Sequence, residues 1–254
     1  MWSSAGLSAS VVEHPGFQVT RGERLCEVFV KLGGSILDDD VATDELASYL
    51  TKVARSHRVV ILPGGGHVVK RIKAVHKEHD GDFHDCWRAA VLCVDVNAGI
   101  LAAYSRSFSV VSSAADICAC FATGNIAVFA PAVAILNSLD LLPAWQPTTD
   151  SMGLYFANLL GAQRYVIVSD VHGIYHDKPA VGTRLPPLSR LTVEELERLP
   201  SSKLDPVFPA YFRRYALPTV VVNGRHPERV CAAIRGESTI GTEIVSPQEA
   251  CLGA

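Results

Sequence analysis

The chain has 254 residues, of which 48% are hydrophobic and 19% charged, so it is long and apolar enough to fold around a large core. Its net charge is −3 and no lysine or arginine run stands out, which argues against a nucleic-acid partner. Polar residues or prolines interrupt the longest apolar stretches, and the start lacks a signal-peptide pattern. The seven cysteines lack the spacing of a disulfide framework. We therefore expect a cytoplasmic protein with no membrane partner.

The chain alternates between apolar runs typical of buried strands and segments with helical periodicity. We expect residues 1–23 to be a poorly ordered leader and residues 24–254 to form one domain. The expected strands are 28–32, 59–62, 107–112, 126–129, 165–169, 220–222 and 240–245. The expected helices are 41–55, 67–77, 84–104, 151–160, 192–199 and one from about residue 227. Repeated β-α-β units with fully apolar strands predict an α/β fold, a three-layer αβα sandwich with a mainly parallel central sheet.

Two glycine-rich turns follow the first two expected strands of this domain. They are Lys31-Leu32-Gly33-Gly34-Ser35 and Pro63-Gly64-Gly65-Gly66, and each precedes a helix. Ligands of an open parallel sheet bind beyond the carboxyl ends of its strands, where glycine lets backbone N–H groups approach an anion. Tight β-α turns also use glycine for steric reasons alone, but two such turns with a lysine at a strand end favour a phosphate site.

Other catalytic motifs are absent from the sequence. It contains no G-x-x-x-x-G-K-S/T, no G-x-G-x-x-G, no H-E-x-x-H and no G-x-S-x-G. These absences argue against a P-loop enzyme, a Rossmann dehydrogenase, a zincin and an α/β-hydrolase. His76 and His79 are expected on a solvated surface.

Four segments taken together resemble the amino acid kinase superfamily. They are the two glycine turns, residues 149–151 leading to 159–162, and Ser169-Asp170-Val171-His172-Gly173-Ile174-Tyr175, with residues 240–244 similar to the closing strand of that family. The segment 221–230 and Trp145 shortly before Asp150 resemble the branch of the family that phosphorylates [5-(aminomethyl)furan-3-yl]methyl phosphate in methanofuran biosynthesis. The resemblance implies an ATP-dependent kinase with an acceptor-side lobe over 24–149 and a nucleotide-side lobe over 150–254.

The resemblance also implies a role for individual residues. Lys31 would stabilise charge on the transferred phosphoryl group, and Asp150 would orient that lysine, although an aspartate before a helix also suits an N-cap. The N–H groups of Gly33, Gly34 and Ser35 would bind the ATP phosphates. The nucleotide loop would comprise Ser169, Asp170, Gly173 and Tyr175, although packing explains Tyr175 equally well. Mg²⁺ would bridge the ATP phosphates without a dedicated set of protein ligands.

The acceptor side is expected within residues 67–149. Gly64, Gly65 and Gly66 would line it by resemblance, with Thr149 preceding Asp150. Arg88 could pair with a phosphate on the acceptor, and Trp87 or Trp145 could form an aromatic wall. These three could equally be core or dimer contacts.

One departure from the family pattern concerns a second catalytic lysine. Acetylglutamate kinases carry it before the last central strand, whereas residues 205–210 here contain no cation. Lys178 or Lys203 could replace it, or the site could function with Lys31 and Mg²⁺. The turn after residue 222 could likewise place Arg225 or His226 beside the nucleotide, or serve only as a strand-to-helix turn.

Three functional hypotheses remain at this point. The first is a kinase that converts a small phosphate monoester to a diphosphate, and the second is a family member that acts on a carboxylate or a nucleotide, such as acetylglutamate, uridylate or isopentenyl phosphate kinases. The third is a non-catalytic protein that binds nucleotides or oxyanions. As partners we expect ATP, a small-molecule phosphate acceptor and further copies of the chain in a homo-oligomer.

Overall fold

A parallel sheet dominates the computed structural model, which describes residues 11–14, 17–20, 22–53, 56–138, 140–177, 185–200 and 202–246. Eight strands of the described chain form this sheet in the order β5-β6-β4-β3-β7-β9-β10-β8. They are β3 (Val28–Leu32), β4 (Val59–Pro63), β5 (Phe108–Val111), β6 (Ile126–Phe129), β7 (Arg164–Ser169), β8 (Arg190–Thr192), β9 (Thr219–Asn223) and β10 (Gly241–Val245). Neighbours pair in parallel except β10 with β9, which are antiparallel.

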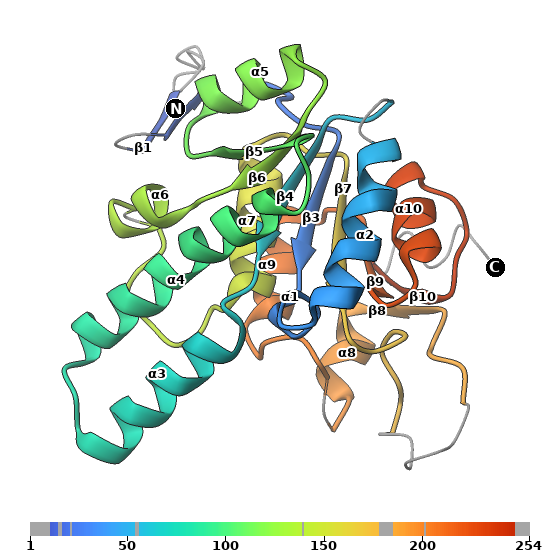
Figure 1. The fold of residues 1–254 in the computed structure, drawn as a ribbon. Coiled ribbons are helices and arrows are strands. Elements are labelled where there is room, and N and C mark those ends of the chain that lie inside the picture. The colour runs from blue at the N-terminus through green and yellow to red at the C-terminus, as the bar shows by residue number, and fades with distance from the viewer. Residues whose placement is uncertain are drawn as a thin grey trace, which may run out of the picture.

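Helices cover both faces of the sheet, as Figure 1 shows, so the predicted α/β sandwich is confirmed. The helices of the described chain are α1 (Gly34–Leu37), α2 (Asp40–Val53), α3 (Gly66–His79), α4 (Phe83–Ala103), α5 (Ala114–Ala122), α6 (Ala132–Leu136), α7 (Thr149–Leu159), α8 (Val193–Arg198), α9 (Phe208–Tyr215) and α10 (Pro227–Arg235). One apolar core joins the sheet to α5, α7 and α9. The other joins it to α2, α10 and the end of α4.

The strand register brings the two glycine turns to one edge of the sheet. Leu32 at the end of β3 pairs with Pro63 at the end of β4 and with Val168 of β7. β3 and β4 are apolar on both faces because helices cover both, and the lysine at position 31 is the single charged residue within them. The carboxyl ends of three central strands therefore meet where the sequence predicts the ligand edge.

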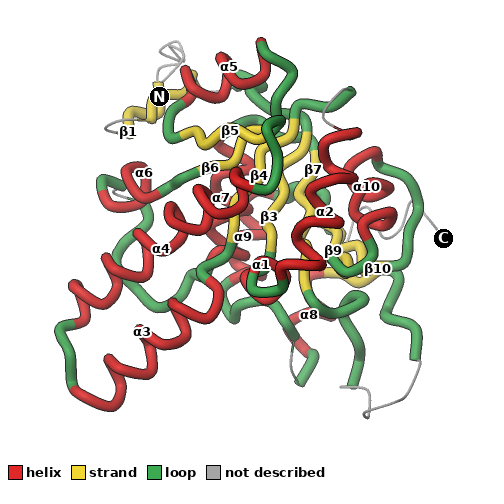
Figure 2. Tube along the Cα trace, in the orientation of Figure 1, coloured by secondary structure: helices red, strands yellow, loops and turns green. Residues whose placement is uncertain are grey.

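Helix α3 and the start of α4 form an antiparallel pair that extends away from the sheet, while the rest of α4 lies on the sheet (Figure 2). α4 is the one helix within the described residues that is long and apolar enough by composition to cross a membrane. Such a helix is weak evidence for a membrane span, and here Trp87, Val91, Ala98 and Leu101 are buried against the protein. α4 thus serves as a helix that covers the sheet.

The expectation of a poorly ordered leader is wrong for part of residues 1–23. Residues 1–10 lie outside the described residues, but β1 (Val11–His14) and β2 (Phe17–Thr20) form an antiparallel hairpin. Phe17 is fully buried, with its ring centroid 5.4 Å from that of Phe129. Burial of an aromatic ring stabilises this segment, since each large apolar side chain contributes about 1.5–3 kcal/mol on burial.

Candidate active site

The two glycine turns touch each other backbone to backbone. A Cβ atom on Gly34 would clash with the backbone nitrogen of Gly66, and one on Gly64 would lie 2.7 Å from the nitrogen of Gly34. Gly66 also has a φ of +60°, which disfavours residues with side chains. Glycine is thus required by the close approach of the turns, which places the starts of α1 and α3 side by side.

Not every glycine N–H is available to a phosphate. The N–H of Gly33 donates to the carbonyl of Val168 at 2.8 Å, and that of Gly64 donates to the carbonyl of Leu32 at 2.7 Å. The prediction that Gly33 donates to ATP is therefore wrong. Gly34 and Ser35 occupy the first helical positions of α1, where N–H groups have no acceptor within the helix.

Lys31 and Asp150 form a largely buried ion pair at the centre of this edge. The Lys31 Nζ lies 2.7 Å from the Asp150 Oδ1, and their side chains are 12% and 9% exposed. Lys31 projects from β3, and Asp150 lies in the first turn of α7, which packs on that strand. The arrangement is that of a lysine whose position is fixed by a carboxylate.

Asp150 is not the N-cap of α7. The N-cap is Thr148, whose hydroxyl accepts from the Asp150 N–H at 3.4 Å. Asp205, which is buried, holds this helix start by accepting hydrogen bonds from both the N–H and the hydroxyl of Thr148 and of Ser151. The carboxylate of Asp205 thereby fixes the helix that presents Asp150.

An apolar pocket of about 190 Å³ opens beside the second glycine turn. Its lining consists of Gly65, Gly66, Val69, Lys73, Trp87, Ala90, Val91, Val94, Ile135, Ala144, Trp145, Pro147, Thr148, Thr149 and Met152. The expected acceptor residues Gly65, Gly66, Trp145 and Thr149 are brought together here, whereas Gly64 is buried behind the turn.

Trp145 is fixed in this pocket by contacts from α3 and α4. Its ring lies 5.6 Å from the ring of Phe83 and 5.4 Å from that of His76, so His76 is packed rather than fully solvated. The Lys73 ammonium donates to the Trp145 carbonyl at 3.4 Å. Burial lowers the pKa of Lys73, and the negative charge of Asp205 opposes this shift.

Arg88 does not join these residues. It is exposed and lines a separate hollow with His84, Trp87, Leu136 and Asn137. Because the helix turns Arg88 away while Trp87 faces inward, Arg88 is not placed to bind an acceptor in the apolar pocket.

The expected nucleotide side lies at the ends of β7 and β9. Ser169 is half-buried, and its hydroxyl donates to the Asp170 Oδ1 at 3.3 Å. Asp170 is exposed, and its Oδ1 forms an ion pair with the Lys203 Nζ at 3.6 Å. Gly173 has a φ of +153° and is buried against Thr242, while Tyr175 is half-buried. Lys178 lies outside the described residues.

Arg225 and His226 in the turn after β9 contact different parts of the protein. Arg225 forms an ion pair with Asp39 at the start of α2, so its charge is already compensated. The ring of His226 lies 5.3 Å from that of His172, which Arg229 also contacts at 2.9 Å. Burial and the neighbouring Arg229 lower the pKa of His172.

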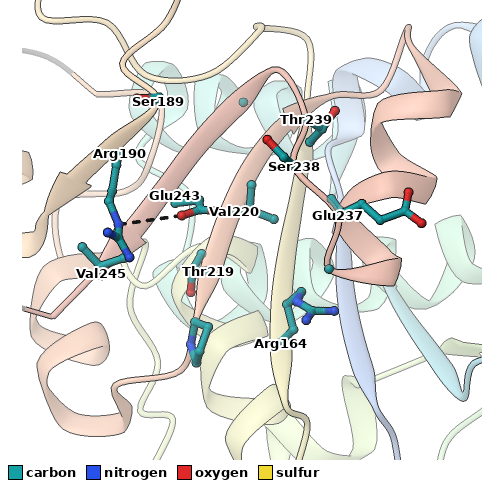
Figure 3. A pocket seen from close by; sticks show the side chains of 14 residues that line it. Arg164, Ser189, Arg190, Thr219, Val220, Glu237, Ser238, Thr239, Glu243 and Val245 are labelled. Atoms are coloured by element: carbon teal, nitrogen blue, oxygen red, sulfur yellow. Dashed lines mark ion pairs between the residues drawn. The ribbon is translucent and has the colours of Figure 1, made fainter. Parts of the chain in front are cut away.

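A larger hollow of about 720 Å³ lies far from this chemistry (Figure 3). It lies against the start of β7 and the antiparallel β9–β10 pair, and it contains the ion pair of Arg190 with Glu243. Arg164 on its wall donates to the carbonyl of Ile234 near the end of α10. Its charged groups are thus engaged in structural contacts.

The sequence matches the model of the amino acid kinase family over residues 27–222. The chain belongs to the amino acid kinase family. It is therefore an ATP-dependent kinase, a phosphotransferase with ATP and a phosphate acceptor as substrates.

Relatives in this kinase family cover nearly the whole chain. A [5-(aminomethyl)furan-3-yl]methyl phosphate kinase from Methanocaldococcus jannaschii is 30% identical over 85% of this chain and 96% of its own. A uridylate kinase from Methanothrix thermoacetophila is 28% identical over 86% and 99%. The crystal structure of the Archaeoglobus fulgidus uridylate kinase matches with a TM-score of 0.68 and 23% identity over 86% of this chain and all of its own, which supports the fold.

Two residues of the kinase site escaped sequence reasoning. Lys73 follows Val69 by one helical turn and shares a helix face with His76, but this pattern alone does not show that the face meets Trp145. Asp205 lies in a segment where a cation was sought, and its carboxylate was therefore overlooked. The signal available in the sequence was the position of Asp205 directly before Pro206 and the amphipathic segment 208–215.

Proposed function

We propose that this kinase transfers the γ-phosphoryl group of ATP to a small phosphate monoester, giving a diphosphate, with [5-(aminomethyl)furan-3-yl]methyl phosphate as the preferred acceptor. The observation that carries the proposal is the pocket of about 190 Å³ beside Gly65 and Gly66, with tryptophans in its wall and a lysine on its lining. An aromatic wall suits a small ring, and a cation suits the phosphate attached to it.

A phosphate acceptor fits the groups at the site. Its second pKa is about 6, so it carries an ionised oxygen nucleophile at neutral pH and needs no general base. That oxygen forms a bond to the γ-phosphorus while the bond from the γ-phosphorus to the β,γ-bridging oxygen breaks, and ADP leaves with that electron pair. The reaction mainly requires alignment and compensation of charge.

Charge compensation and ATP binding fall to different residues of the site. Lys31, held by Asp150, stabilises the negative charge on the transferred group, because it is oriented and largely desolvated. The N–H groups of Gly34 and Ser35 bind ATP phosphates, and Ser169, Asp170, Gly173 and Tyr175 line the nucleotide side. Mg²⁺ supplies further charge neutralisation when it arrives with ATP.

The apolar lining favours a small ring over a nucleotide as the acceptor. Uracil and ribose together carry more hydrogen-bonding groups than a furan ring with one aminomethyl group, and buried polar groups need partners. The side chains in the pocket wall that can hydrogen-bond are those of Lys73, Trp87, Trp145, Thr148 and Thr149, while the others are apolar. The relative that is 30% identical bears the name of a furan phosphate kinase, which supports the same choice.

The proposed setting is the cytoplasmic biosynthesis of a methanofuran-type one-carbon carrier by a homo-oligomeric enzyme. Steady-state kcat/KM with Mg-ATP tests the acceptor, using [5-(aminomethyl)furan-3-yl]methyl phosphate, UMP, isopentenyl phosphate and acetylglutamate. We expect the furan phosphate to give the highest value. A higher value for UMP or acetylglutamate would overturn the proposed acceptor.

A further inference from the structure

Lys73 is a half-buried cation that forms no direct ion pair with a carboxylate of the described residues, and the charge of Asp205 acts on it only from a longer distance. Lys31 and Lys203 pair with Asp150 and Asp170 at 2.7 and 3.6 Å, whereas no ion pair joins Lys73 to a carboxylate within the described part of the chain. Its polar contact is the carbonyl of Trp145 at 3.4 Å. A buried ammonium group loses hydration, and an anion close by would restore its stabilisation.

The position of Lys73 links the apolar pocket with the catalytic ion pair. Lys73 lines the pocket that contains Gly65 and Gly66, and it also lines an adjoining opening that contains Asp150 and Lys203. Trp145 and Thr148 border both spaces as well. An anion bound to Lys73 would therefore lie between the body of an acceptor and the site of phosphoryl transfer.

Trp145 holds this lysine in place. The Lys73 Nζ lies 5.2 Å from the centroid of the indole ring, within cation–π range, and the ring itself is packed on Phe83. Since the indole ring and the Trp145 carbonyl both contact the ammonium group, less side-chain freedom remains to be lost when an anion binds. The neighbouring Lys70 and Lys77 on α3 are exposed and lie outside the pocket.

We propose that Lys73 binds the phosphate of the acceptor and makes that negative charge a condition for acceptor binding. The inference rests on the proposed function, because it names the group on the same acceptor that Lys73 recognises. Lys73 is thus a specificity-determining residue that selects a phosphate monoester over the corresponding alcohol.

The test compares Lys73→Met and Lys73→Arg with wild type and with Lys77→Met as a matched control on the same helix. Methionine keeps an unbranched apolar stem on Trp145 and removes the charge, and arginine restores the charge. We expect Lys73→Met to raise the KM for [5-(aminomethyl)furan-3-yl]methyl phosphate about 10- to 100-fold, the loss of one charge-assisted hydrogen bond. The KM for ATP should stay within about twofold, because Lys73 recognises only the acceptor. Lys73→Arg should recover most of the loss, and Lys77→Met should match wild type.

Calorimetry separates the failure of this inference from the failure of the proposed function. The furan phosphate and its alcohol are titrated into wild type and Lys73→Met in the presence of a non-hydrolysable ATP analogue. We expect wild type to bind the phosphate more tightly than the alcohol, and Lys73→Met to bind both equally weakly. If wild type turns over the phosphate and Lys73→Met has an unchanged acceptor KM, the inference is wrong and the function stands. If wild type binds the phosphate through Lys73 without turnover, the function is wrong and the inference stands. The inference is also overturned if wild type and Lys73→Met bind the furan phosphate with equal affinity, or if neither protein binds it.

Discussion

Replacing Asp205 by asparagine tests how the protein holds the start of α7 and, through it, Asp150. The Oδ2 of Asp205 accepts from the Thr148 N–H at 3.0 Å, the Thr148 hydroxyl at 2.8 Å and the Ser151 N–H at 3.2 Å. Its Oδ1 accepts from the Ser151 hydroxyl at 2.6 Å and the Val207 N–H at 3.2 Å. All five partners are donors, so the carboxylate cannot be exchanged for an amide without loss.

The loss in free energy of unfolding depends on how many N–H donors the asparagine amide would leave without an acceptor. The amide NH₂ would replace either Oδ2, which faces two backbone N–H groups, or Oδ1, which faces the single N–H of Val207. The second orientation costs less, since the Ser151 hydroxyl can rotate and accept. One unsatisfied N–H and the loss of charge on the remaining bonds together cost about 2–4 kcal/mol. A loss of about 3 kcal/mol lowers the melting temperature of a chain of this size by about 6–12 °C.

Thermal unfolding and steady-state turnover are measured for Asp205→Asn and for Glu243→Gln, a control in which the carboxylate is exposed and 3.8 Å from Arg190. The control should melt within about 2 °C of wild type, because surface ion pairs contribute about 0–1 kcal/mol. Turnover of Asp205→Asn should fall at least about 10-fold, since misplacing a catalytic group by about 1 Å costs up to about 100-fold. If Asp205→Asn matched the control in melting temperature and turnover, Asp205 would not hold the helix start.

Three further predictions concern the catalytic pair and the acceptor lysine. Lys31→Ala should lower kcat about 100- to 1000-fold while ATP binding, measured by calorimetry, changes much less; turnover like that of wild type would remove Lys31 from catalysis. Asp150→Asn should lower kcat about 100-fold with a smaller change in melting temperature than Asp205→Asn, because Thr148 still caps α7; unchanged kcat would show that the carboxylate does not orient Lys31. Burial lowers the pKa of Lys73 from its usual 10.5, so Lys73 loses its charge, and kcat/KM for the acceptor should fall, as pH rises toward 10.5. In Lys73→Arg this fall should move to higher pH, because arginine stays charged. Identical pH profiles for the two proteins would exclude Lys73 as the titrating group.

The parts of the fold that sequence predicts are those with strong local patterns. Apolar runs such as 59–62 and glycine turns at strand ends predicted the central strands and the ligand edge, because parallel strands buried on both faces leave a continuous apolar signal. α9 was not predicted, since Pro206 and Pro209 suggest a break, yet a proline in the first turn of a helix is tolerated. The hairpin of β1 and β2 was missed because its stability comes from tertiary burial of Phe17.

The same distinction applies to the candidate site: residues within sequence motifs were predicted, and residues that depend on long-range contacts were not. Lys31 and Asp150 were predicted from motifs, and their 2.7 Å contact agrees with the expected pairing. Arg88 was expected at the acceptor because a phosphate on the acceptor calls for a cation, but adjacent helix positions point in directions about 100° apart, so Arg88 is exposed while Trp87 is buried. Lys73 and Asp205 depend on contacts across 72 and 57 residues of sequence, to Trp145 and Thr148, which no local pattern reveals.

Phosphorus NMR of one reaction tests the central claim most directly. Wild-type protein is incubated with Mg-ATP and [5-(aminomethyl)furan-3-yl]methyl phosphate, and the spectrum is recorded over time. The account predicts loss of the monoester singlet, formation of ADP, and two coupled doublets from the phosphorus–oxygen–phosphorus linkage of a new diphosphate ester. Persistence of the monoester singlet, while ATP is consumed in a parallel reaction with acetylglutamate, would contradict the proposed function. Failure to form ADP with any acceptor tested would contradict it as well.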